Sequence, residues 1–125
     1  MITVLPLQEE SRKNRLLQAL PVQPSHGQVL VMCDGPEELG FAVLDLQASV
    51  LRLYQICVYG DDPGGMFADF LMRSAASYAA NFGAYQIDLY DRDFFDFFCA
   101  RGFTRHAECV SVPLSAIVRV HKPDS

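Results

Sequence analysis

The segment YGDDPGGMFADFLMRSAASYA, residues 59–79, joins a glycine-rich turn to the start of an amphipathic helix. Gly64 and Gly65 stand where the helix begins, and glycine lets the backbone approach a ligand closely. The first N–H groups of a helix have no partner within the helix, and with the helix dipole they attract anions. The spacing therefore predicts a turn that can hold a phosphate group against the helix N-terminus.

Two carboxylates in the same turn favour a different interpretation. Asp62 followed by Pro63 is a good helix start in any fold, with Asp62 as the N-cap and Pro63 at the first helical position. In that arrangement the Asp62 carboxylate accepts the N–H groups that a phosphate would need, and Asp61 adds a second negative charge. A phosphate site and a capped helix without a ligand are both open at this point.

The elements around this turn predict a single domain, residues 1–125, with a mixed α+β fold. Apolar periodicity indicates a strand, a helix, three antiparallel strands, a helix, a strand, a short helix and one or two closing strands. In chain order the ranges are 2–7, 9–20, 28–33, 40–46, 50–60, 64–82, 84–90, 92–101 and 107–120. We expect strands 51–58 and 85–90 to be parallel neighbours that splay apart near Val58, with helix 64–82 crossing between them.

The helix predicted over 64–82 should pack on one face of the sheet, because its apolar residues recur at steps of three and four. This stripe consists of Phe67, Phe70, Leu71, Ala75, Tyr78 and Phe82. The later short helix is expected to contribute core aromatics, namely Phe94, Phe95, Phe97 and Phe98.

This order of elements and two local motifs resemble the GCN5-related N-acetyltransferase (GNAT) family. LYQICVYGDDPGGMFADFLM, residues 53–72, resembles that family's fourth strand and acetyl-CoA loop, and FFCARGFTR, residues 97–105, resembles its late aromatic and glycine signature. The resemblance implies an acyl-CoA-dependent N-acyltransferase that transfers an acetyl group to an amine, with acetyl-CoA or another acyl-CoA as cofactor. The cofactor residues that it implies are Ile56, Cys57, Val58, Gly64, Gly65, Met66, Phe67 and Ala68.

The chain departs from the family pattern at positions that would carry chemistry. Pro63 and Met66 replace the family's Arg/Gln and first glycine, and Ala68 alone is retained at the last position. Phe98 stands where many relatives have a tyrosine that protonates the coenzyme A thiolate, which a phenyl ring cannot do.

Other groups would then have to move the protons. The thiolate would be protonated by water or by Tyr54, Tyr59, Tyr90 or Cys99, and Tyr54 is our candidate among them. Asp45 and Glu108 are the candidate bases, since they lie on or near predicted strands that hold side chains rigidly. The alternative for each carboxylate is a solvated side chain.

One helix precedes the hairpin strands, and the link over 21–27 is too short for a second. This predicts an open, shallow acceptor side, which a partner chain in a homodimer would cover. The departures also leave a second function open, a catalytically inactive GNAT-like domain that binds a ligand or a protein, with acyl-CoA binding weakened or lost. The sequence does not identify the acceptor, whether a small-molecule amine or a peptide.

Composition argues against several classes of protein. The 125 residues carry a formal charge of −5 with scattered basic residues, which disfavours nucleic acid as a partner. No apolar run approaches the roughly 18 residues of a membrane span, and the N-terminus lacks a cleavage site, so a cytoplasmic protein is expected. The four cysteines are widely spaced and have apolar neighbours, which predicts buried thiols with no disulfide and no metal; they are Cys33, Cys57, Cys99 and Cys109.

Overall fold

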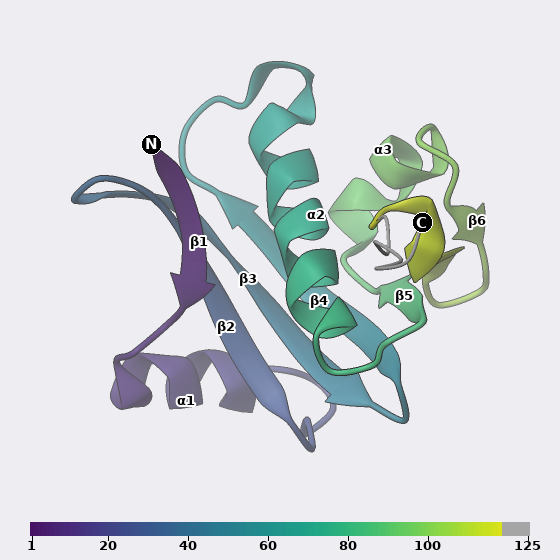
Figure 1. Ribbon diagram of the computed structural model, residues 1–125, viewed down its shortest axis with the longest axis horizontal. Coiled ribbons are helices and arrows are strands. Elements are labelled where there is room, and N and C mark those ends of the chain that lie inside the picture. The colour runs from purple at the N-terminus through teal and green to yellow at the C-terminus, as the bar shows by residue number, and fades with distance from the viewer. Residues whose placement is uncertain (119–125) are drawn as a thin grey trace, which may run out of the picture.

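The computed structural model describes residues 1–118 and arranges them as one mixed sheet with helices on both faces (Figure 1). The seven strands lie in the order β1-β2-β3-β4-β5-β7-β6. They are β1 Ile2–Pro6, β2 Gly27–Asp34, β3 Glu37–Gln47, β4 Val50–Val58, β5 Gln86–Leu89, β6 Thr104–Arg105 and β7 Val110–Pro113. The helices are α1 Glu10–Gln18, α2 Met66–Ala80 and α3 Phe95–Cys99, with short 3-10 turns η1 Pro63–Gly65, η2 Arg92–Phe94 and η3 Leu114–Ala116. This order confirms the predicted α+β fold.

The end of the chain differs in detail from the prediction. The strand expected over 107–120 is limited to β7, and the following residues form η3. The last two positions of that predicted range lie outside the described residues. The short strand β6 was not predicted, because two residues are too few to show a period.

Strand β4 pairs with β3 in antiparallel and with β5 in parallel orientation, and α2 makes the crossover between β4 and β5 (Figure 1). The parallel pairing confirms the expectation. It ends where Leu53 faces Leu89, after which the Tyr90 N–H donates to the Leu53 carbonyl at 2.8 Å. The strands therefore separate several residues before Val58, and the predicted position of the splay was wrong.

A β-bulge accounts for this early separation. Val43 pairs with Gln55 and Leu44 pairs with Leu53, which leaves Tyr54 without a partner on β3. An extra residue on one strand bends that strand and increases its local twist. The bulge therefore turns the second half of β4 away from β5.

The helices pack on opposite faces because apolar residues of β2 and β3 alternate between the faces. Leu16 and Leu17 of helix α1, with Leu20 after its end, cover a cluster on one face that consists of Val29, Val31, Phe41 and Val43. Helices α2 and α3 cover the other face, where the larger apolar core contains Leu30, Met32, Leu44, Leu53, Ile87 and Leu89. No helix among residues 1–118 is long and apolar enough to cross a membrane.

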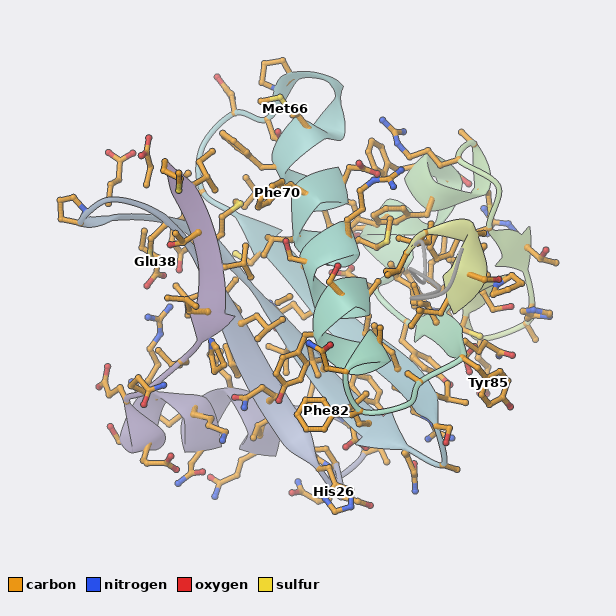
Figure 2. All side chains as sticks on the ribbon, in the orientation of Figure 1. His26, Glu38, Met66, Phe70, Phe82 and Tyr85 are labelled. Carbon is orange, nitrogen blue, oxygen red and sulfur yellow. The ribbon has the colours of Figure 1, made fainter. Side chains whose placement is uncertain are left out.

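The buried stripe of α2 differs from the predicted one. It consists of Ala68, Leu71, Met72, Ala75, Ala76 and Ala79. Alanines allow the helix to lie close to the sheet, so the larger rings are displaced to its flanks. Phe70 and Phe82 are 39% and 63% exposed, and Figure 2 shows Met66 and Phe70 near the start of α2 and Phe82 beyond its end.

The aromatic residues of α3 lie in the core as predicted, whereas the cysteines are less buried than predicted. Phe95 and Phe98 are buried, and Phe94 and Phe97 pack against the same core, as predicted. All four cysteines are free thiols, but they are half-buried rather than buried. Within residues 1–118 no group of three or more His, Cys, Asp or Glu side chains is placed to hold a metal ion.

Candidate functional site

The separation of β4 from β5 leaves one edge of β4 without a strand partner, and we call this region the β4–β5 opening. In an antiparallel ladder, consecutive residues direct their N–H groups to alternate sides. The Tyr59 N–H donates to the Leu39 carbonyl of β3 at 2.9 Å. By this alternation, Ile56 and Val58 direct their N–H groups away from β3 and into the opening.

A carboxylate from the β5 side already occupies one of these donors. The Ile56 N–H donates to Asp91 Oδ2 at 3.0 Å, and the Asp93 N–H donates to Asp91 Oδ1 at 3.3 Å. Burial raises the pKa of Asp91, and the two N–H groups oppose that shift. Asp91 was not predicted from the sequence, although an acid placed directly after a strand and before a helical turn is a typical cap.

The start of α2 is occupied in the same way. Asp62 Oδ1 accepts the Phe67 N–H at 2.9 Å, and Asp62 Oδ2 accepts the Ala68 N–H at 3.0 Å. Both donors belong to the set expected to hold a pyrophosphate. The Asp62 carboxylate therefore caps the start of α2 and stands where the oxygens of an anion would bind. Asp62 and Pro63 take the predicted N-cap and first positions only in the turn η1, whereas the N-cap position of α2 is Gly65.

The two glycines of this turn differ in their surroundings. Gly64 and Gly65 both have left-handed backbones, with φ of 70° and 68°, so α2 begins at Met66 and not at residue 64. A Cβ on Gly65 would lie 2.1 Å from Cε1 of Phe97, whereas a Cβ on Gly64 would meet nothing within 4 Å. Packing against Phe97 therefore explains Gly65 without any ligand.

Arg101 is a cation beside the turn that was not predicted from the sequence. Its guanidinium lies 3.7 Å from the centre of the Phe97 ring, and its Nη2 donates to the Gly64 carbonyl at 3.2 Å. Its Nε lies 3.5 Å from Asp69 Oδ1, and Arg73 pairs with the same carboxylate at 2.8 Å. Arg101 follows α3 in the chain, so only the folded structure brings it to the turn.

On the α1 face, two adjoining hollows form what we call the α1-side groove. The first, of about 610 Å³, follows β4 from Tyr54 to Cys57 and reaches Asp91. The second, of about 370 Å³, contains Arg52 and Glu108. Both hollows are lined by Pro21, Tyr54, Tyr90 and Arg92.

Of the three predicted catalytic residues, the structure brings two together. Tyr54 and Glu108 line the same hollow, and Tyr54 stacks on Tyr90 with ring centres 5.2 Å apart. Asp45 is 1% exposed and accepts the backbone N–H groups of Ser25 and His26 at 3.3 and 2.7 Å. It therefore fixes the loop after α1 and does not line the groove.

No family model matches the chain, and a search of curated proteins finds no match. Its structure is similar to that of PaiA N-acetyltransferase from Thermoplasma acidophilum in complex with coenzyme A, with a TM-score of 0.57 and 16% identity over 69% of this chain and 58% of that one. For a mutant of spermidine N-acetyltransferase SpeG from Vibrio cholerae, the TM-score is 0.68 and the identity is 12%, over 94% of this chain and 96% of that one. For an acetyltransferase of the GNAT family from Desulfovibrio desulfuricans, the TM-score is 0.66 and the identity is 9%, over 91% of this chain and 99% of that one. This chain has the GNAT fold.

Within the GNAT fold, the position expected for a proton-donating tyrosine is part of the core. Phe98 is fully buried against Phe94, Phe97 and Phe103. A tyrosine hydroxyl at this position would need a buried partner. Phe98 therefore acts as a packing residue in this chain.

Tyr59 is also committed elsewhere in this GNAT fold. Arg12 donates to both oxygens of Glu38, at 2.8 and 2.7 Å, and the Tyr59 hydroxyl donates to the same carboxylate. Glu38 lies at the β2–β3 hairpin in Figure 2. Burial and the Glu38 carboxylate raise the pKa of Tyr59 to about 12, so Tyr59 is a poor proton donor at neutral pH.

Proposed function

We propose that this chain is a GNAT-type N-acyltransferase that binds acetyl-CoA or another acyl-CoA in the β4–β5 opening and acylates an amine in the α1-side groove. The observation that carries the proposal is the opening itself. Directly after β5 stops pairing, β4 turns the N–H groups of Ile56 and Val58 away from β3, and Tyr54 of the same strand segment lines the groove. A thioester carbonyl bound by such N–H groups is polarised toward attack.

The reaction needs two proton transfers. The amine nitrogen forms a bond to the thioester carbonyl carbon, the carbon–sulfur bond breaks, the amine loses a proton, and the coenzyme A thiolate gains one. Glu108 would accept the amine proton through water, since it is exposed in the second hollow. Tyr54 would protonate the thiolate, because it lies between that hollow and the opening.

Two carboxylates oppose the cofactor in this proposal. Asp62 holds the N–H groups of Phe67 and Ala68, and Asp91 holds that of Ile56. A like-charge contact at about 4 Å costs about 1 kcal/mol in water and about 4 kcal/mol at an effective dielectric near 20. We therefore expect acyl-CoA to bind weakly and to displace both side chains when it binds.

The same contacts favour a second function, a catalytically inactive GNAT-like domain that binds a ligand or a protein. In that case Asp62 is a permanent helix cap and Phe98 marks the loss of the usual acid. For both the acyltransferase and the inactive domain, we propose a cytoplasmic location and a homodimer that covers the α1-side groove.

Amide NMR during a titration with acetyl-CoA tests the proposed function. The amides of Ile56, Val58, Phe67 and Ala68 should shift together, because the proposal places the cofactor on both donor sets. Amides of β1 should stay unchanged and serve as the internal control. If millimolar acetyl-CoA shifts none of the four amides, the inactive domain is the better account.

A further inference from the structure

The second hollow of the α1-side groove contains two arginines that have no ion-pair partner among residues 1–118. Arg52 and Arg92 both line it, while the ion pairs of arginines in residues 1–118 involve Arg12, Arg73, Arg101 and Arg105. The chain as a whole carries a formal charge of −5. The charged residues that line the hollow, two arginines and Glu108, therefore carry a net positive charge, opposite in sign to that of the chain.

Arg52 has unused hydrogen-bonding capacity. Its Nε is buried and has no partner within the described part of the chain. Asp45 and Asp88 flank it on β3 and β5, but Asp45 accepts two backbone N–H groups and Asp88 accepts the side-chain amide of Gln86 at 2.6 Å. Since a buried donor without a partner is unfavourable, a ligand oxygen that hydrogen-bonded to this Nε would relieve that cost.

Apart from Glu108, the remaining lining of the hollow is aromatic or apolar. Tyr54 and Tyr90 stack with an interplanar angle of 22°, and Pro21 and Val22 contribute apolar surface. The volume of about 370 Å³ suits a ligand of the size of a single amino acid. Glu108 is the one acidic residue of this lining.

We propose that this hollow binds a small amino acid-like molecule, whose carboxylate is held by Arg52 and Arg92 and whose planar side group lies against the Tyr54–Tyr90 pair. A guanidinium matches a carboxylate with two parallel hydrogen bonds, which makes arginine the preferred residue for this recognition. Glu108 would face the ammonium group of the ligand. That such a molecule is the acyl acceptor rests on the proposed function, but its binding does not.

Calorimetry without acyl-CoA tests the proposal with three matched probes, namely phenylalanine, phenylpropionate and phenylethylamine. These share one ring and differ in which charged groups they carry. We expect phenylalanine and phenylpropionate to bind about tenfold or more tightly than phenylethylamine, because only the first two offer a carboxylate to the arginines. Arg52→Gln and Arg92→Gln should each weaken binding of the two carboxylates by about tenfold, whereas Arg73→Gln, on the opposite face, should change nothing.

Equal binding of all three probes, binding of the amine alone, or no binding of any probe would overturn the proposal. Circular dichroism should first show that each variant is folded. If Arg52→Gln does not fold, Arg52→Lys, which keeps the charge but not the planar guanidinium, should still weaken phenylalanine binding. An unchanged affinity of Arg52→Lys for phenylalanine would contradict the proposal. Acetyl-CoA is titrated separately, so a protein that binds phenylalanine but not acetyl-CoA refutes the acyltransferase and leaves the carboxylate site standing.

Discussion

Asp62→Ala should destabilise the protein by about 1 to 2 kcal/mol, because the substitution removes the side chain that caps α2. The carboxylate accepts two N–H groups at 2.9 and 3.0 Å, and its charge also lies at the positive end of the helix dipole. Alanine leaves both donors to water. Asp62→Asn keeps one acceptor oxygen and should cost roughly half as much.

Urea unfolding followed by circular dichroism measures this difference directly, with Asp61→Ala as the matched control. Asp61 neighbours Asp62 in the exposed part of the turn, so its removal should change the free energy of unfolding by less than about 0.5 kcal/mol. If Asp62→Ala is as stable as the wild type, the carboxylate is not a cap. The capped description of this turn would then fail.

Three further substitutions test other parts of the structure. Asp91→Asn should stabilise the protein at neutral pH, because burial raises the pKa of Asp91 above its ordinary 3.8. The protonated carboxyl group favours the folded state, and this contribution is lost as pH rises through the raised pKa. Unfolding measured at pH 7 and at pH 3 should therefore show a gain in stability at pH 7 alone. Gly65→Ala should cost about 2 kcal/mol more than Gly64→Ala in thermal unfolding, since only the former clashes with Phe97, and equal costs would contradict this packing. Glu38→Gln should destabilise the protein by about 1 kcal/mol at pH 7, because Arg12 lowers the pKa of Glu38 below 4.5. The stability that the Glu38 carboxylate contributes is lost as pH falls through the lowered pKa. A loss of stability as large at pH 3 would argue against the ion pair.

Features that depend on neighbouring residues in the chain could be predicted from the sequence. Strand and helix periods indicated the order of the elements. The Asp62-Pro63 pair indicated that the Asp62 carboxylate caps the helix start, although Gly65 and not Asp62 is the N-cap residue of α2. Capping could be anticipated because the side chain and the N–H groups that it accepts lie within six residues. The buried stripe of α2 was misplaced because its alanines are less conspicuous in the sequence than the phenylalanines beside them.

Features that depend on contacts between distant segments could not be predicted. The bulge at Tyr54 exists only in the pairing of β3 with β4, and it sets where β4 leaves β5. Asp91 reaches Ile56 from 35 residues away, and Arg101 reaches Gly64 from 37 residues away. Asp45 looked like a candidate base because no local pattern showed that the loop at residues 25 and 26 would bind its carboxylate.

Calorimetric titration with acetyl-CoA at low salt, comparing the wild type with Asp62→Asn combined with Asp91→Asn, tests the central claim most directly. Both substitutions remove a negative charge and keep an acceptor oxygen, so the cap and the contact to Ile56 can persist while the repulsion is removed. We predict weak binding by the wild type and at least about fivefold tighter binding by the double variant, from the roughly 1 kcal/mol of a like-charge contact in water. The gain should shrink as salt is added. No heat from either protein at millimolar acetyl-CoA would contradict the account and identify this GNAT fold as one that no longer binds the cofactor.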